Sequence, residues 1–210
     1  MVSFASYINR HSNETNGCVP QGFNPETFQP LYDGVKTAGA CNNDIAISRS
    51  TDGGGTFSGG ATDVRDLPTT RSDDQAADQF WQWAAYDPRG RFAVSYYDRA
   101  YGDDETTGFS DISLSGTRNG TDFATTRVTT DSMPPPTQFS GGFYDDYSGL
   151  SAGNVGHPIW MDTRDPDLFV CRDSAGNVTQ PPSVCTAGAH NAAVANDQNA
   201  YTRSLSVPMP

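Results

Sequence analysis

The sequence is poor in positive charge and has no long apolar run. It contains 13 basic and 25 acidic residues, which gives a net charge of −12. Nucleic acids bind basic surfaces, so this balance argues against a nucleic-acid partner. No apolar stretch approaches the length of a bilayer-spanning segment, and we therefore expect no membrane span. The opening residues "MVSFASYINRHS" also lack the charged and apolar regions of a signal peptide.

Cysteine is scarce, and its four residues fall into two local pairs, Cys18 with Cys41 and Cys171 with Cys185. Each pair brackets a loop rich in glycine and proline, and the C-x-x-C spacing of many metal sites is absent. Disulfides Cys18–Cys41 and Cys171–Cys185 are the preferred interpretation, with free thiols as the alternative. Disulfides would indicate a secreted, extracellular protein whose leader peptide is not part of this chain.

What the chain does contain is an internal repeat. Three strand-like runs end in arginine: "SFASYINR" at Arg10, "RFAVSYYDR" at Arg99 and "GHPIWMDTR" at Arg164. After a loop, three further runs open on aspartate: "DIAIS" at Asp44, "DISLS" at Asp111 and "DLFVC" at Asp167. The second and third units also carry an earlier strand, "FWQWAAYD" from Phe80 and "DDYSGLSA" from Asp145.

Three repeats of about four strands each favour propeller blades, because one small sheet cannot bury its own face and must stack on neighbours. We expect an all-β partial β-propeller forming a single domain over 1–210, with repeat units of about 1–70, 71–135 and 136–205. Almost no helix is expected beyond a turn in 187–196. A Greek-key sandwich is the alternative. The chain opens inside the second strand of its first unit, so open blade edges predict self-association.

The glycine-rich stretch "SRSTDGGGTF" follows the first of the Asp-initiated runs. The Asp52 carboxylate can accept N–H bonds from the turn, Gly53 to Gly55 permit positive φ angles, and Phe57 is expected to pack back between sheets. "GTRNGTDF" is a degenerate copy in the second unit, and 172–177 is a related turn in the third.

This turn resembles the Asp-box, or BNR repeat, of the sialidase (neuraminidase) propellers in five positions: Ser50, Asp52, Gly54, Thr56 and Phe57. The segments "QFWQWAAYDPRGRFAVSYYDR", "GGFYDDYSGL" and "HPIWMDTR" are similar to secreted bacterial proteins grouped with exo-α-sialidases, and the resemblance covers roughly 2–185. It implies a six-bladed propeller, of which this chain would form about the C-terminal half. It also implies a site on the face opposite the Asp-box, where first strands start and second strands end.

The resemblance places six residues on that rim: Arg10, Arg99, Arg164, Trp81, Asp146 and Tyr147. The arginines would hold a substrate carboxylate, which a guanidinium fork matches. Because an arginine recurs in every unit, the alternative is a local ion pair, with Asp98 for Arg99 and with Asp162 or Asp165 for Arg164.

Tyr147 is the catalytic candidate, with Asp146 beside it, because "DYSGL" resembles the Tyr-Ser-x-Leu stretch that carries the sialidase nucleophile. The implied reaction is that of a retaining exo-glycosidase on sialic-acid-type terminal sugars. That chemistry needs a glutamate base, yet the chain's glutamates match no family motif: Glu14, Glu26 and Glu105. Packing of Tyr147 at a blade edge, in a non-catalytic propeller that binds a glycan or a protein, is therefore the alternative.

Metal and cofactor signals are weak. The acidic loop with Asp103, Asp104 and Glu105 suggests calcium but lacks the spacing of a known calcium motif, so a solvated loop is the alternative. The histidines are scattered along the chain, and we expect no zinc site and no cofactor. The expected partner is a carbohydrate.

Overall fold

The computed structural model describes ten segments of the chain, and the statements below concern these residues: 1–6, 19–23, 30–33, 43–59, 67–71, 77–101, 109–134, 147–171, 173–177 and 192–210. Every regular element among them is a β-strand, and all strand pairings are antiparallel. The all-β prediction is confirmed for this part of the chain.

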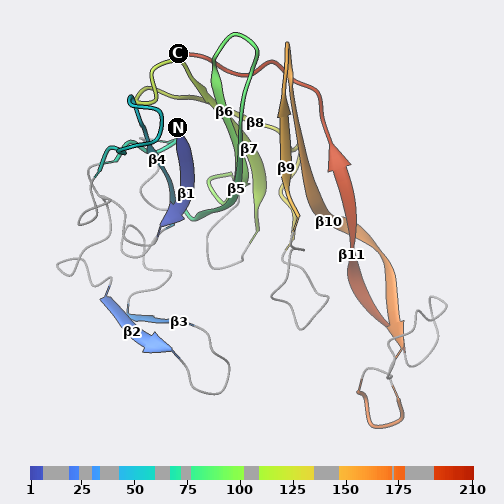
Figure 1. Ribbon diagram of the computed structural model, residues 1–210. Coiled ribbons are helices and arrows are strands. Elements are labelled where there is room, and N and C mark those ends of the chain that lie inside the picture. The colour runs from blue at the N-terminus through green and yellow to red at the C-terminus, as the bar shows by residue number, and fades with distance from the viewer. Residues whose placement is uncertain are drawn as a thin grey trace.

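A four-stranded sheet forms the centre of the molecule (Figure 1). Its strands follow the chain in the order β5 (Gln79–Tyr86), β6 (Phe92–Asp98), β7 (Asp111–Thr117) and β8 (Ala124–Arg127). Both β6 and β7 are buried along their whole length, so the polar residues that alternate with Ile112 and Leu114 in β7 are buried as well. This sheet matches the second repeat unit strand for strand.

The two flanking sheets are less regular. On one side, β1 (Val2–Ser6) pairs with β4 (Asp44–Ser48), and the chain returns to form a bridge between Thr69 and Ala46. On the other side lie β9 (Gly149–Ala152), β10 (Gly156–Cys171) and β11 (Ala192–Thr202), in the order β11-β10-β9. Strands β2 (Val19–Phe23) and β3 (Pro30–Asp33) form a separate two-stranded sheet.

Several expectations about strands were wrong. The run from Asp167 is not a separate strand, because it continues β10, which forms a long two-stranded ribbon with β11. The first unit contains the β2–β3 pair where a loop was expected. The expected turn in 187–196 is strand from Ala192 onward, and the rest of that stretch lies outside the described residues. Within the described ranges, the central sheet alone has the four strands that we expected of each unit.

Two apolar layers hold the three sheets face to face. Ile45 and Ile47 of β4 pack against Phe92, Val94 and Tyr96 of β6 to form the first layer. On the opposite face of the central sheet, the second layer joins it to the third sheet through nine buried residues: Ala93, Tyr97, Ile112, Leu114, Val128, Met133, Leu150, Trp160 and Val207. Alternate residues of β6 therefore enter different layers, as the period of two in a strand requires.

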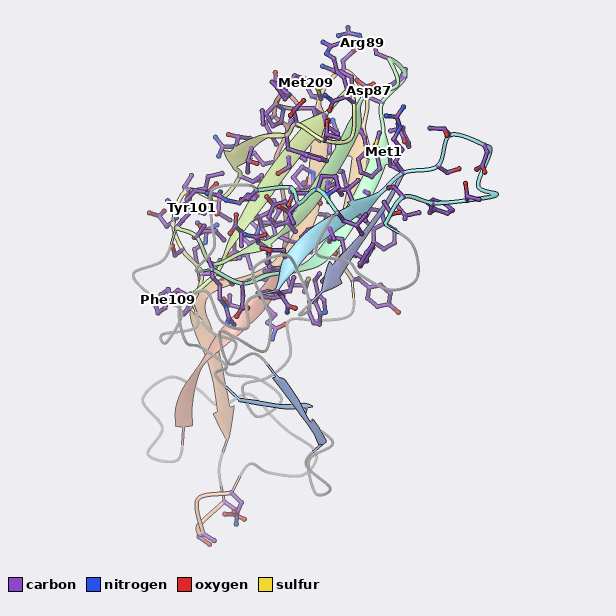
Figure 2. The ribbon with its side chains drawn as sticks, turned by 90° about the vertical axis from the view of Figure 1, so that its left-hand side faces the viewer. Met1, Asp87, Arg89, Tyr101, Phe109 and Met209 are labelled. Atoms are coloured by element: carbon purple, nitrogen blue, oxygen red, sulfur yellow. The ribbon has the colours of Figure 1, made fainter. Side chains whose placement is uncertain are left out.

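The sheets have two chemically different ends. One end, which we term the rim end, carries Gln79, Asp98 and Asp111, aligned across three neighbouring strands. Figure 2 shows Tyr101 and Phe109 at this end, and Asp87 and Arg89 at the opposite end of the central sheet. The opposite end, which we term the turn end, also carries the 50–57 turn after β4 and the 118–123 turn after β7, joined by a hydrogen bond from Arg49 to the Asn119 carbonyl.

Candidate functional site

The 50–57 turn is held by its own side chains. The Asp52 carboxylate accepts bonds from the Thr56 N–H at 2.9 Å and the Thr56 hydroxyl at 2.7 Å, and Ser50 donates to it at 2.7 Å. These bonds lower the pKa of Asp52 well below its usual value. Gly53 and Gly54 have φ angles of +74° and +97°, as expected, so side chains at these positions would be strained, whereas Gly55 does not have a positive φ.

The expectation for Phe57 was wrong, because this ring is 45% exposed and does not pack between sheets. Its counterpart in the second unit, Phe123, does pack against the first apolar layer. In that unit Asn119 replaces the aspartate and accepts N–H bonds from Thr121 and Asp122, both at 2.9 Å. Each turn is thus closed by a side-chain oxygen that accepts backbone N–H bonds, but Asp52 binds the residue four positions later and Asn119 binds those two and three positions later.

Trp81 is the most unusual residue of the rim end. It lies in a β-bulge of β5, where the register with β6 shifts between Phe80 and Trp83. Its φ angle is +49°, and no other non-glycine residue among those described has a positive φ. Such strain is common at functional sites, where the backbone is forced to aim a side chain. The indole is 40% exposed, so the bulge presents an aromatic surface to solvent.

Aromatic contacts connect Trp81 to its surroundings. Its ring makes edge-on contacts with Phe80 and Tyr97 at centroid distances of 6.3 Å and 6.2 Å. The Tyr97 hydroxyl bonds to the backbone of Met161 in β10. The Ser148 hydroxyl donates to the Trp81 carbonyl at 3.4 Å, which brings the start of β9 to the same place.

Arg99 follows β6 and lies near this group. Its guanidinium carbon is 5.3 Å from the centre of the Phe80 ring, and Nη1 is 3.2 Å from Oδ2 of Asp78. The ion pair therefore involves Asp78, whereas the sequence suggested Asp98. Because the Arg99 side chain is only 16% exposed and already faces a carboxylate, its geometry agrees with the structural interpretation of the repeat arginines.

Arg164 belongs to a different group. Its guanidinium binds Asp162 through Nε and Nη2, the latter at 2.6 Å, and Nη1 contacts Thr130 and, at 3.8 Å, Asp131. Burial acts to raise the pKa of Asp162, but hydrogen bonds from Arg164 and Trp160 outweigh burial and keep that pKa below its usual value. Asp162, one of the two expected partners, is thus the partner observed.

Tyr147 is 79% exposed and immediately precedes Ser148, which contacts Trp81. Its position next to the start of β9 places it at the rim end, as expected from the sequence. Asp146, its neighbour, lies outside the described residues.

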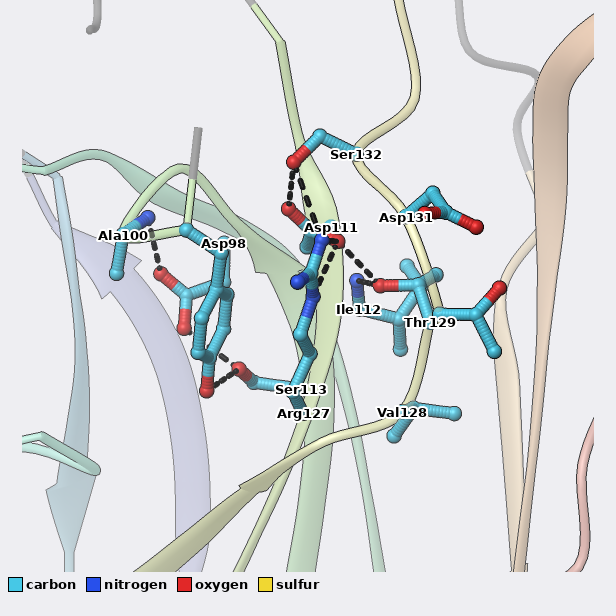
Figure 3. Close-up of polar contacts among 12 residues, drawn as sticks. Asp98, Ala100, Asp111, Ile112, Ser113, Arg127, Val128, Thr129, Asp131 and Ser132 are labelled. Carbon is cyan, nitrogen blue, oxygen red and sulfur yellow. Dashed lines mark hydrogen bonds and ion pairs between the residues drawn. The ribbon is translucent and has the colours of Figure 1, made fainter. Parts of the chain in front are cut away.

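Sequence reasoning missed a polar cluster at the rim end that is built around two buried carboxylates (Figure 3). Asp98 accepts bonds from the Ser113 hydroxyl at 2.6 Å and the Ala100 N–H at 3.0 Å. Asp111 accepts from Arg127 Nε at 2.9 Å and Ser132 Oγ at 2.7 Å. Both carboxylates are fully buried, so each depends on these donors for the solvation it has lost.

Tyr101 links the two halves of this cluster. The guanidinium carbons of Arg71 and Arg127 lie 5.3 Å and 5.1 Å from the centre of its ring. Arg71 also contacts Asp98 at 3.4 Å and donates to the Tyr101 hydroxyl at 3.0 Å. In the sequence, Asp98 stands near the end of one repeated run and Asp111 begins another. The hydrogen-bond partners of both carboxylates depend on strand register, so the sequence alone did not predict them.

Other candidate residues cannot be placed. Those outside the described residues are Arg10, Cys18, Cys41, Cys185 and the acidic loop of Asp103, Asp104 and Glu105. The backbone of Cys171 ends β10, but its side chain is not described. Within the described ranges, no group of His, Cys, Asp or Glu side chains has an arrangement that could hold a metal ion.

Comparisons of the chain with protein-family models, curated proteins and solved structures found no significant match. A search of the described residues for a helix long and apolar enough to span a membrane also found none.

Proposed function

We propose that this chain is part of a sialidase-type β-propeller whose rim end binds a carbohydrate. Three observations are compatible with the propeller. The sheets stack face to face through two apolar layers. Strand β5 contacts β1 of the first sheet and β9 of the third sheet, as the inner strand of a middle blade would contact both neighbouring blades. The 50–57 turn lies at the end of the sheets opposite Trp81 and Tyr147.

The observation that carries the binding proposal is the exposed, strained Trp81. An indole face stacks well on the apolar face of a sugar ring, and a rigid aromatic loses little conformational entropy on binding. Tyr147 directly precedes Ser148, which contacts Trp81. The exposed Tyr147 side chain could bond a sugar hydroxyl through its own hydroxyl. The sugar class to test first is sialic acid, because the sequence resemblance points to it.

Turnover is the second candidate, and the exposure of Tyr147 favours it. A phenol acts as a nucleophile only where a base removes its proton. The described residues include no glutamate, and Asp146 lies outside them. Binding is therefore the function that the described geometry supports best.

Calorimetric titration with N-acetylneuraminic acid and with galactose tests the binding proposal. We expect saturable binding by the wild-type chain and a loss of about tenfold in affinity for Trp81→Ala, which corresponds to about 1.4 kcal/mol. Phe57→Ala is the matched control, because Phe57 is similarly exposed but lies at the turn end. Absence of binding to both sugars, or equal losses in both variants, would contradict the proposal.

A fluorogenic sialoside separates binding from turnover. If the chain is catalytic, the wild type releases the fluorophore and Tyr147→Phe, which keeps the ring but lacks the hydroxyl, does not. If the chain only binds, neither protein turns over the sialoside, while both retain affinity for the free sugar.

A further inference from the structure

The seam between the first sheet and the central sheet runs along one edge of β4. Pro68 and Thr70 attach to that edge through the bonds Ile47 N–H to Pro68 O at 2.9 Å and Thr70 N–H to Ile45 O at 3.0 Å. The first residue of β5 continues the same edge, because the Gln79 N–H donates to the Asn43 carbonyl at 2.8 Å. Thr70 and Gln79 are therefore neighbours, bonded to the carbonyls of Ile45 in β4 and of Asn43 just before β4.

Polar side-chain atoms without partners gather at this seam. Gln79 is fully buried, and neither its amide nitrogen nor its amide oxygen has a hydrogen-bond partner in the described part of the chain. The same holds there for Oδ1 of Asn43 and for the Thr70 hydroxyl. The Thr70 hydroxyl lies near the Tyr96 phenol and acts to lower the pKa of that phenol, but the two groups do not have the geometry of a hydrogen bond.

Buried polar groups in folded proteins almost always have partners, and an unpaired amide loses the solvation that it had in water. We propose that the seam is an internal hydration site, in which one or two enclosed water molecules bind the Gln79 amide and bridge it to Asn43 Oδ1 and the Thr70 hydroxyl.

The chemistry of the atoms selects water over an ion. Gln79 presents a donor and an acceptor, Asn43 Oδ1 accepts only, and a hydroxyl can do both. A cation could bind the oxygens but would leave the amide N–H₂ unpaired, and an anion would face two acceptor oxygens. Water donates two bonds and accepts two. Gln79 and Thr70 are bonded to the carbonyls of Asn43 and Ile45, which lie two residues apart on an extended backbone. Two residues of extended backbone span about 7 Å, and one or two waters can bridge such a gap.

The direct test is a crystal structure of the full chain at a resolution that shows ordered solvent. We expect a solvent oxygen at hydrogen-bonding distance from the Gln79 amide and from Asn43 Oδ1 or Thr70 Oγ1. A protein atom bonded to the amide, metal-like contact distances, or a seam without ordered solvent would each overturn the proposal.

Variants provide a second test in solution. Gln79→Leu, which has a similar volume but no amide, should lower the melting temperature, because it leaves the enclosed water without its main partner. An unchanged or raised melting temperature would overturn the proposal. Gln82→Leu is the control on the same strand, because the Gln82 amide already donates to the Ser3 carbonyl at 3.2 Å.

A slowly exchanging water signal at the Gln79 amide protons should be present in the wild type and in Gln82→Leu, and its absence from the wild type would likewise refute the site.

Discussion

Aspartates organise both ends of this molecule. At the turn end, Asp52 closes a loop through bonds to Thr56 and Ser50. At the rim end, Asp98 and Asp111 are buried among hydroxyl, amide and guanidinium donors. An ionised carboxylate accepts several strong bonds at once, so it can replace backbone pairing where strands end. The acidic composition of the chain thus has a structural use at both ends of the sheets.

The low pKa of Asp52 is directly measurable. Its ordinary value is 3.8, and the bonds from Thr56 lower it in the folded chain. The charged form therefore stabilises the turn above the unfolded-state pKa, and that contribution is lost as the pH falls through the folded-state pKa. An NMR titration of the Asp52 carboxyl carbon should give a midpoint below 3.8, and Thr56→Val should move the midpoint upward. A wild-type midpoint at or above 3.8 would contradict the hydrogen-bonded turn.

Arg164 is expected to be a structural residue. Its partner Asp162 has a side chain that is only 2% exposed, so Arg164→Ala leaves a buried carboxylate short of a donor. We expect a loss of about 1–3 kcal/mol in unfolding free energy at pH 7, measured by urea denaturation. Because the pKa of Asp162 is depressed in the folded chain, the loss should shrink as acid protonates this group.

The control for this prediction is Arg118→Ala, since Arg118 is exposed in the 118–123 turn and its removal should change stability little. Equal stability of Arg164→Ala and wild type, or a loss that does not vary with pH, would contradict the structural role of the Arg164–Asp162 pair.

The ion pairs of the repeat arginines show which side-chain contacts the sequence alone can predict. The sequence offers an aspartate within two residues of Arg99 and of Arg164, and for Arg164 this led to the observed partner, Asp162. For Arg99 it did not, because Asp98 accepts a bond from Ser113 in the rim-end polar cluster, while Asp78, the residue before β5, faces Arg99. Adjacent residues of a strand face opposite sides, so neighbours in sequence are poor partners unless the strand has ended.

Among the strands, those of the central sheet were the easiest to predict. Runs such as "FAVSYYD" and "DISLS" are rich in β-branched and aromatic residues and are bounded by turn residues. Strand β10 was misjudged because the repeat pattern led us to expect a loop after Arg164 and a separate strand from Asp167. The structure accommodates Pro166 where the register with β11 shifts between Asp165 and Leu168, and proline is tolerated at such irregular positions.

The bulge at Trp81 yields a prediction about backbone strain. A positive φ disfavours residues with a Cβ atom but not glycine, so Trp81→Gly should be more stable than Trp81→Ala by about 1 kcal/mol. The same pair at Trp83, which lies in the regular part of β5, should show the reverse order, because glycine weakens a strand. Thermal unfolding of the four variants measures both differences. An alanine variant as stable as the glycine variant at position 81 would contradict the strained bulge.

In the molecule as a whole, the packing of the sheets on one another buries two apolar layers but leaves some apolar surface exposed. The central sheet is covered on both faces, whereas β1 pairs with one strand, β4, within the described segments. Large exposed side chains occur on β1 and β5, including Val2 at 44% and Trp83 at 53%. Open edges and apolar surface of this kind promote pairing between copies.

We therefore expect the isolated chain to form dimers or larger species at micromolar concentration, as measured by light scattering after gel filtration. Val2→Lys should reduce the association, because a charged side chain on an edge strand opposes pairing. Ser204→Lys, an exposed substitution outside the strands, is the control for the added charge. A wild-type chain that remains monomeric at all concentrations would contradict this expectation.

The central claim is that the rim end binds a sugar through Trp81, and NMR of the tryptophan side chains tests it most directly. The chain has three tryptophans, so it gives three indole N–H signals. Trp81 is 40% exposed at the rim end, whereas Trp160 is 3% exposed and serves as an internal control. On titration with N-acetylneuraminic acid, the Trp81 signal should shift to saturation while the Trp160 signal stays fixed. No shift of the Trp81 signal at millimolar sugar would contradict the account.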